Sequence, residues 1–185
     1  GVGGIDLGFD RAGFETIYAN EINPKAIETY ELNHGIKVDA RDICEVPTNE
    51  IPDFDILLAG FPCQPFSAAG RQLGFEDTRG TLFFEIAKIL KHKQPDYFLL
   101  ENVENLVIHD LSKEDKKNGE IMGKTLKTIL SVLNNLNYNV SWKVLQASDF
   151  GVAQIRRRIY IVGSKSKTIS LDNFNKKTIN FGEVQ

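Results

Sequence analysis

A short proline-containing turn directly after a buried strand constrains this chain more than any other feature. Residues 55–59, Asp-Ile-Leu-Leu-Ala, are followed by residues 60–67, Gly-Phe-Pro-Cys-Gln-Pro-Phe-Ser. A short apolar run of this kind predicts a strand that is buried on both faces. Each proline fixes its own φ and favours extended geometry in the residue before it. Cys63 is therefore expected in a stiff turn at the carboxyl end of a strand, which is the edge where open α/β sheets bind ligands.

The composition is that of an ordinary globular protein. The chain has 185 residues, of which 42% are hydrophobic and 25% are charged, enough for one sizeable domain. Its longest apolar runs are about four or five residues, far below the roughly 20 that span a bilayer. The only cysteines are Cys44 and Cys63, and no signal peptide is visible, which favours a cytosolic protein with reduced thiols. Cys44 lacks the context of Cys63 and is interpreted as structural.

The first residues predict that the natural protein starts upstream. Met122 is the only methionine, and the chain opens on Gly1-Val2-Gly3-Gly4. A glycine-rich turn of this kind normally follows a strand. We therefore expect a central strand to be missing from this sequence.

Charge is distributed unevenly along the chain. The net charge of −3 argues weakly against a nucleic-acid partner. However, residues 1–60 hold 4 basic and 12 acidic residues, whereas residues 61–185 hold 18 and 13. The densest basic stretch is 156–158, three arginines, and Lys165 and Lys167 follow it with no acid between. Taken alone, this pattern fits a solvated surface as well as a surface that binds an anionic partner.

Helix and strand signals alternate along the chain, which predicts an α/β fold. Asn23 as N-cap and Pro24 at the first position predict a helix to about His34. Further helices are expected at 5–12 and over the apolar periodicity that begins at Leu82 and at Met122. Strands are expected at 14–19, 37–40, 55–59, 97–100, 140–145 and 158–162, the last two as a hairpin. Residues 60–80 are expected to form a long functional loop, and residues 109–120 an exposed connection.

Three features near predicted strand ends suggest a pocket for a nucleoside. The turn Gly1-x-Gly3-Gly4 departs from the dinucleotide fingerprint because Asp6 stands where the third glycine belongs, which disfavours NAD. Glu21 is placed to bind ribose hydroxyls, and Asp42 to accept a bond from an adenine amino group. A tight turn or a surface charge explains each feature equally well or better when it is taken singly. Together they predict an adenosyl pocket.

A thiol and a carboxyl group are expected at the same sheet edge. Gly60 and Pro62 bring backbone close to a ligand beside Cys63, and a thiolate is a strong nucleophile once its pKa is lowered. Glu101 follows the next strand, where a desolvated carboxyl can hold a proton near pH 7. The simpler alternatives are an inert buried thiol and an exposed Glu101 next to Asn102 as a helix cap.

Gln154-x-Arg156-x-Arg158 alternates at strand spacing. Arg156 and Arg158 therefore share one face and can bind a carboxylate or phosphate bidentately. As an isolated run, the same residues would form an ordinary basic surface.

Taken in order, these stretches resemble the cytosine-5 DNA methyltransferase family, and its bacterial restriction-modification branch above all. The likeness reaches to about residue 163 and rests on 1–4, Asn20-Glu21, Asp42-Ile43, 60–67, 101–103 and 154–158. It implies a Rossmann-like S-adenosylmethionine-dependent methyltransferase sheet with helices on both faces, lacking the first strand and the C-terminal target-recognition domain. It makes residues 1–185 part of the catalytic domain, with 60–80 as a mobile active-site loop and 164–185 as the start of the connection to the recognition domain.

The resemblance also implies roles for single residues. The target cytosine is flipped out of the duplex, Cys63 attacks its carbon-6, and Glu101 holds or protonates its N3. Arg156 and Arg158 orient the base and Glu101, and Asn102 braces the turn at Cys63. Cofactor contacts are implied for Gly1, Gly3, Gly4, Glu21, Ile22, Asp42, Ile43, Gly60 and Pro62. Contacts with DNA or the base are implied for Gln64, Ser67, Arg71, Arg79, Asn102, Val103 and Gln154.

The implied partners are S-adenosylmethionine, released as S-adenosylhomocysteine, double-stranded DNA and a cognate restriction endonuclease. We expect a monomer in the bacterial cytoplasm, with no membrane contact and no metal. Ile22 departs from the family, because many members carry tryptophan there. Two alternatives stay open: a tRNA cytosine-5 methyltransferase with the same catalytic residues, and a non-catalytic module that binds cofactor or a partner.

Overall fold

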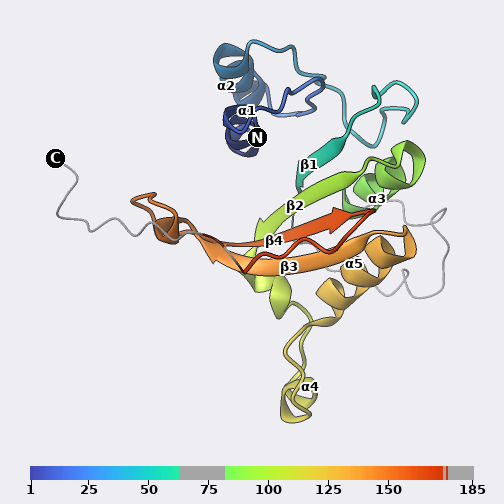
Figure 1. The fold of residues 1–185 in the computed structure, drawn as a ribbon, viewed down its shortest axis with the longest axis vertical. Helices are drawn as coiled ribbons and strands as arrows, with labels where there is room; N and C mark the ends of the chain where they lie inside the picture. Colours follow the sequence, from blue (N-terminus) through green and yellow to red (C-terminus); the bar gives the residue numbers. More distant parts are fainter. Residues whose placement is uncertain (63–81, 173, 175–185) are drawn as a thin grey trace.

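A mixed four-stranded sheet organises the molecule. The computed structural model describes residues 1–62, 82–172 and 174. The strands are β1 (Ile56–Gly60), β2 (Tyr97–Val103), β3 (Asn139–Gln146) and β4 (Arg157–Ser164), in the order β1-β2-β4-β3 (Figure 1). β1 and β2 are parallel, whereas β4 is antiparallel to both β2 and β3. This sheet and its helices confirm the predicted α/β class and the predicted hairpin.

Five α-helices and two short 3₁₀ helices belong to the described residues. They are α1 (Gly4–Arg11), α2 (Pro24–His34), α3 (Leu82–Lys93), α4 (Lys113–Lys117), α5 (Lys124–Asn135), η2 (Glu104–Val107) and η3 (Ala147–Asp149). α2 begins where the sequence predicts it, because the Asn23 side chain accepts the N–H groups of Lys25 and Ala26. Gly35, with φ of 67°, ends the same helix in the left-handed region. Within this part of the chain, no helix is both long and apolar enough to cross a membrane.

The main core lies between the sheet and α3 and α5. Phe98 and Leu100 of β2 alternate with less buried neighbours, so they point to one face of the sheet. They pack there with apolar residues that recur at helical spacing in the two helices, namely Phe83, Ile86, Ala87 and Leu90 of α3 and Leu126, Ile129 and Leu133 of α5. Fully burying a side chain of this kind contributes about 1.5–3 kcal/mol. The other face of β2 carries Glu101, so packing on one side orients the polar residue toward the other.

A smaller core connects the N-terminal third to the sheet. Val46, Ile51 and Ile89 are buried together, and Tyr18, Ile43 and Leu57 pack against them. Leu57 belongs to β1 and Ile89 to α3, so residues 18–51 adjoin the β1 side of the sheet. Figure 1 shows α1 and α2 beyond β1, on the side away from β3.

Two of the predicted strands are wrong as regular elements. Near these segments the described residues form one isolated parallel bridge, between Asn20, which follows the first segment, and Asp39 of the second. Phe14 and Ile17 remain 49% and 50% exposed, although Tyr18 of the same segment packs against the small core. A strand needs partner strands or a buried face, and a two-stranded ribbon alone is marginal.

The connection 109–120 is mostly exposed, as expected, but it is not irregular throughout, and the expected structural role of Cys44 is wrong. The polar connection 109–120 contains α4, because Ser112 and Asp115 form a reciprocal capping box that starts this five-residue helix. Cys44 is an exposed free thiol rather than a buried structural residue. Its turn faces solvent next to Asp42, since the backbone N–H of Cys44 donates to that carboxylate.

Candidate active site

Glu101 is the centre of a charged cluster at the carboxyl end of β2. Its Oε1 atom lies 3.0 Å from Nε of Arg158 and 3.4 Å from Nη2 of Arg156. The Glu101 and Arg158 side chains are 20% and 24% exposed, so the pair is only partly open to water. The Arg156 contact is a charge-assisted hydrogen bond, and the Arg158 contact is an ion pair. One carboxylate oxygen is therefore held by two guanidinium groups.

Strand register explains how the cluster assembles. Glu101 of β2 is the partner of Tyr160 in β4, and Val103 is the partner of Arg158. Side chains two residues apart on a strand share a face, so Arg158 and Tyr160 lie on the Glu101 side of the sheet. Arg156 precedes β4 and reaches the same carboxylate, which confirms that the two arginines share a face. Burial, and next the Glu101 charge, raise the pKa of Tyr160.

The end of β1 lies next to Glu101. Gly60 and Glu101 are register partners in the parallel pair. A Cβ atom placed on Gly60 would lie 3.5 Å from Oε2 of Glu101. The second carboxylate oxygen therefore points toward the glycine that leads into the Phe61-Pro62 turn.

Asn102 ties this turn to β2. Its side-chain N–H donates to the Phe61 carbonyl at 2.8 Å, and its Oδ1 accepts the N–H of Val103. Asn102 is only 2% exposed, so the contact is shielded from water. Phe61 and Pro62 are thus held beside Glu101, and Cys63 is the next residue in the sequence.

Glu21 lies in a separate group of residues, in the N-terminal third. Its Oε1 accepts the backbone N–H groups of Ile22 and Asn23, each at 2.8 Å. The carboxylate is anionic and able to accept bonds from hydroxyl groups.

Asp42 follows the neighbouring extended segment. Its Oδ1 accepts the Cys44 N–H at 2.9 Å, and this hydrogen bond lowers the pKa of the exposed carboxyl. Since Asn20 and Asp39 form a parallel bridge, Glu21 and Asp42 both emerge at the carboxyl ends of adjacent segments. Ile43 packs into the small core behind Asp42.

Gly3 shapes the turn before α1. It has φ of 82° and is buried, and a Cβ atom there would lie 2.1 Å from Nε2 of His34 and 2.7 Å from Cε2 of Tyr30. Only glycine fits such a position without a shift of its neighbours. Gly4 begins α1 and Gly1 is exposed at the start of the chain.

The structure does not join every predicted site residue to these two groups. Ile22 is 59% exposed, and Gln154 lies in an exposed bend before Arg156. Val103 is 39% exposed at the end of β2. Five predicted residues lie outside the described part of the chain: Cys63, Gln64, Ser67, Arg71 and Arg79.

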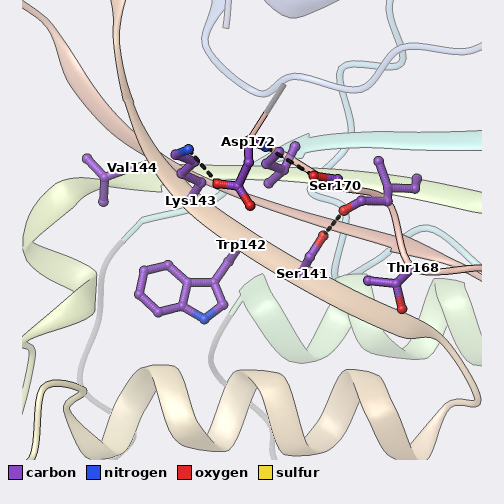
Figure 2. A pocket seen from close by; sticks show the side chains of 9 residues that line it. Ser141, Trp142, Lys143, Val144, Thr168, Ser170 and Asp172 are labelled. Atoms are coloured by element: carbon purple, nitrogen blue, oxygen red, sulfur yellow. Dashed lines mark hydrogen bonds and ion pairs between the residues drawn. The ribbon is translucent and has the colours of Figure 1, made fainter. Parts of the chain in front are cut away.

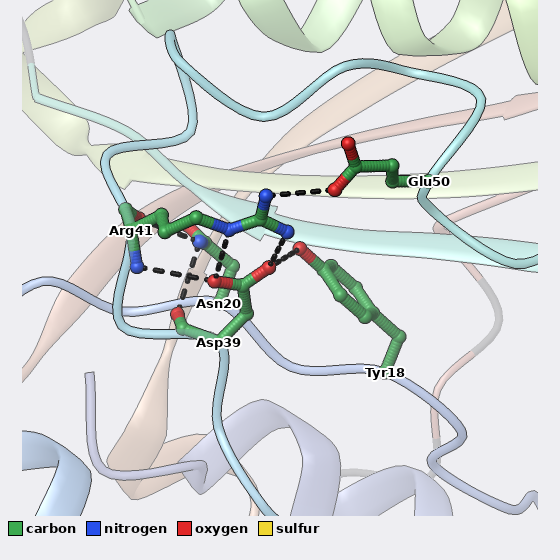
Figure 3. A network of polar contacts seen from close by, with 5 residues as sticks. All are labelled: Tyr18, Asn20, Asp39, Arg41 and Glu50. Carbon is green, nitrogen blue, oxygen red and sulfur yellow. Dashed lines mark hydrogen bonds and ion pairs between the residues drawn. The ribbon is translucent and has the colours of Figure 1, made fainter.

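Sequence reasoning missed two sets of contacts. Arg157 points to the opposite side from its neighbours and pairs with Glu104 at 2.8 Å. Tyr18, Asn20, Asp39, Arg41 and Glu50 form a polar network between the segments that carry Glu21 and Asp42 (Figure 3). The sequence drew attention to Asn20 only as the neighbour of Glu21. Its hydrogen-bond partners, Asp39 and Arg41, lie about twenty residues further along the chain, so no local pattern points to them.

A further pocket lies over the edge strand β3, where Lys143 is the register partner of Tyr160. Residues 141–144 of β3 and 168–172 line it (Figure 2). Ser141 donates to the Ile169 carbonyl at 2.5 Å, and Lys143 pairs with Asp172 at 2.6 Å. These contacts join the chain after β4 to the edge strand. Elsewhere in the described residues, no group of three or more His, Cys, Asp or Glu side chains is arranged to hold a metal ion.

Solved structures that are similar in fold include methyltransferases. The chain matches a Dnmt2 methyltransferase from S. pombe with a TM-score of 0.72 and 26% identity, covering 100% of this chain and 56% of that one. A DNMT2 mutant from Spodoptera frugiperda matches with a TM-score of 0.68 over 95% of this chain and 51% of the other. At 24% identity, the second match supports the fold alone.

Curated relatives are more similar in sequence. Type II methyltransferase M.NgoBV of Neisseria gonorrhoeae is 52% identical over 174 residues, which are 90% of this chain and 40% of that relative. Type II methyltransferase M.HhaI of Haemophilus parahaemolyticus is 43% identical, over 94% of this chain and 49% of that relative. The chain thus spans less than half the length of these relatives. The family model of the C-5 cytosine-specific DNA methylase matches residues 1–183, and the chain belongs to that family.

Proposed function

We propose that the protein carrying this chain is an S-adenosylmethionine-dependent DNA (cytosine-5-)-methyltransferase, and that residues 1–185 are part of its catalytic domain. The observation that supports this most directly is the Glu101 cluster beside the Phe61-Pro62 turn, in a chain of the C-5 cytosine-specific DNA methylase family. Glu101 is held by two arginines and lies beside the Phe61-Pro62 turn, which Cys63 follows in the sequence. This arrangement suits a reaction in which a cysteine is the nucleophile and a carboxyl group holds a proton.

The residues around Glu21 and Asp42 fit an adenosyl group. Carboxylates accept hydrogen bonds, and the ribose hydroxyls and the adenine amino group are donors. Gly3 leaves no room for a side chain beside the turn that opens α1. Glu21 would hold the ribose, Asp42 the adenine, and Gly3 and Gly4 the methionine end. The bound cofactor supplies the methyl group.

The proposed reaction uses Cys63, which follows β1 in the sequence, and Glu101, near the carboxyl end of β2. The Cys63 thiolate adds to carbon-6 of a flipped-out cytosine, and Glu101 holds a proton at N3 so that negative charge does not build up on the ring. Carbon-5 becomes nucleophilic and takes the methyl group. A base removes the carbon-5 proton, the bond between Cys63 and carbon-6 breaks, and the thiolate is restored. Arg156 and Arg158 orient Glu101 throughout.

The wider assignments follow from the family. Double-stranded DNA is the substrate. The roles expected for residues 60–80 and 164–185 fall largely outside the described residues and stay predictions. We also propose a monomeric protein of the bacterial cytoplasm that acts beside a cognate restriction endonuclease. The curated relatives support the bacterial setting alone, because they are type II methyltransferases of Neisseria gonorrhoeae and Haemophilus parahaemolyticus.

Covalent trapping on 5-fluorocytosine tests the reaction. Fluorine at carbon-5 cannot leave as a proton does, so the enzyme–DNA adduct should survive denaturation and be visible by mass spectrometry. The protein carrying this chain is incubated with S-adenosylmethionine and substituted duplex DNA, beside the variants Cys63→Ala and Cys44→Ser. The second variant is the matched control, because Cys44 is an exposed thiol on another loop.

We expect an adduct in the unaltered protein and in Cys44→Ser, and none in Cys63→Ala. An adduct that persists in Cys63→Ala contradicts the nucleophile. Trapping on 5-fluorocytosine tRNA but not on duplex DNA contradicts the DNA substrate and favours the tRNA reading. The absence of an adduct on both polymers contradicts the proposed reaction.

A further inference from the structure

We infer that Asn20 is a positioning residue that sets the separation of Glu21 and Asp42, and so controls affinity for the adenosyl group. Together with Tyr18, Asp39 and Arg41 it forms what we call the segment clamp. The inference rests on the proposed function, because the separation of Glu21 and Asp42 affects binding only if both residues bind the same nucleoside.

The Asn20 amide joins two segments with both of its N–H groups. It donates to the Asp39 carbonyl at 3.1 Å and to the Arg41 carbonyl at 2.8 Å. The backbone adds two bonds, from Asp39 N–H to the Ala19 carbonyl at 2.8 Å and from Glu21 N–H to the Asp39 carbonyl at 3.2 Å. The Asn20 contacts therefore lie directly before Glu21 on one segment and directly before Asp42 on the other.

The Asp39 side chain adds further hydrogen bonds to the contact between the two segments. It accepts bonds from the Tyr18 hydroxyl at 2.9 Å and from Nε and Nη2 of Arg41 at 3.0 and 2.7 Å. Arg41 extends the network through Nη1 to Glu50 at 2.7 Å. The Arg41 guanidinium is the main cause that holds the pKa of Asp39 well below its usual range. The Asp39 side chain is 15% exposed and its bond from Tyr18 is partly buried, whereas the Arg41 side chain is 48% exposed and its bonds are open to water.

The side-chain bonds of the segment clamp supplement a short backbone pairing between the two segments. A regular parallel pair of strands would fix the relative height of Glu21 and Asp42 by repeated backbone hydrogen bonds. Here only one bridge pair exists, so side-chain bonds must supply the remaining restraint. Two carboxylates that bind opposite ends of one rigid ligand gain affinity from being preorganised at the right separation.

A double-mutant cycle separates positioning from general stability. Affinity for S-adenosylhomocysteine is measured by titration calorimetry in the protein carrying this chain, for Asn20→Ala, Asp42→Ala and the double variant. We expect Asn20→Ala to weaken binding about tenfold in the unaltered background and less than about threefold once Asp42 is absent. A purely structural effect would cost the same factor in both backgrounds.

Two further variants keep the test decisive. Tyr18→Phe removes one bond to Asp39 but keeps the ring in the small core, and we expect about threefold weaker binding. Asn33→Ala is the matched control, because it removes an amide-to-carbonyl bond of 2.7 Å on the exposed side of α2 and should leave affinity unchanged. KM for S-adenosylmethionine should rise in Asn20→Ala while kcat changes less than twofold.

The outcomes distinguish this inference from the proposed function. If the unaltered protein binds S-adenosylhomocysteine and the Asn20→Ala and Tyr18→Phe variants bind it equally well, the positioning role is wrong and the function stands. Equal losses in both backgrounds of the cycle also overturn the positioning role. If the unaltered protein binds no S-adenosylhomocysteine, the cofactor assignment fails and the inference fails with it.

Discussion

The side chain of Asn102 donates a hydrogen bond of 2.8 Å to the carbonyl of Phe61, which joins the end of β2 to the turn after β1. This contact lies between Glu101, the neighbour of Asn102, and the residues that lead to Cys63. A single buried amide therefore connects the two halves of the proposed catalytic pair.

Replacing Asn102 with alanine should lower both stability and turnover. The Phe61 carbonyl would lose its partner in a site that is almost closed to water, at a cost of about 1–3 kcal/mol in the free energy of unfolding. Urea unfolding measures this cost, and methyl transfer to DNA measures the effect on the turn. Asn139→Ala is the control, because its amide donates to the Ser164 carbonyl in a more exposed place. Equal losses in the two variants would contradict a special role for the Asn102 contact.

Replacing Arg158 with alanine should lower kcat by about 10²-fold, the lower range for removal of a group that supports proton transfer. The physical reason is that Glu101 would keep only its longer contact, to Arg156. Arg157→Ala is the matched control on the next residue, since its ion pair with Glu104 is surface-exposed and worth about 0–1 kcal/mol. Single-turnover methyl transfer checks the difference, and similar rates in the two variants would contradict the orienting role of Arg158.

Replacing Gly3 with alanine should displace the turn before α1. The new Cβ would lie 2.1 Å from the His34 ring, and φ of 82° is unfavourable for alanine, so we expect a loss of about 1–3 kcal/mol. Gly8→Ala, inside α1 with nothing within 4 Å of the new atom, should instead stabilise by about 0.5–1 kcal/mol. Thermal unfolding of the two variants should therefore shift in opposite directions.

Alkaline pH should destabilise the fold through Tyr138. Burial raises the pKa of Tyr138 to about 12, from about 10 in an unfolded chain. The neutral phenol is therefore favoured in the folded state, and its contribution is complete below pH 10 and lost as pH rises toward 12. The free energy of unfolding should fall by about 2–3 kcal/mol over this range from this group.

Denaturant titrations at several pH values test this dependence. Tyr138→Phe should have a shallower decline above pH 10, and a lower stability at neutral pH because the bond to the Pro95 carbonyl is lost. Tyr97→Phe, at an exposed tyrosine, is the control. An unchanged slope in Tyr138→Phe would contradict the assignment.

Local features of the fold could be predicted from sequence because their causes lie within a few residues. Composition and spacing in short windows determine three of these features. They are the strand β1, the Asn23 cap of α2 and the hairpin of β3 and β4. The strands expected at 14–19 and 37–40 were wrong because strand formation depends on partners elsewhere in the chain. The α4 capping box was missed within a stretch that looked uniformly polar.

For the site, the sequence by itself determined which chemical groups are present and at which strand ends they occur. Alternation placed Arg156 and Arg158 on one face, and an apolar run followed by a proline turn marked the sheet edge. Only the tertiary structure decided that both arginines bind the same oxygen of Glu101, that Asn102 holds Phe61, and that Asn20 joins two segments. Such pairings connect residues that are 19–57 positions apart. Their geometry follows from strand register and packing, which no local pattern encodes.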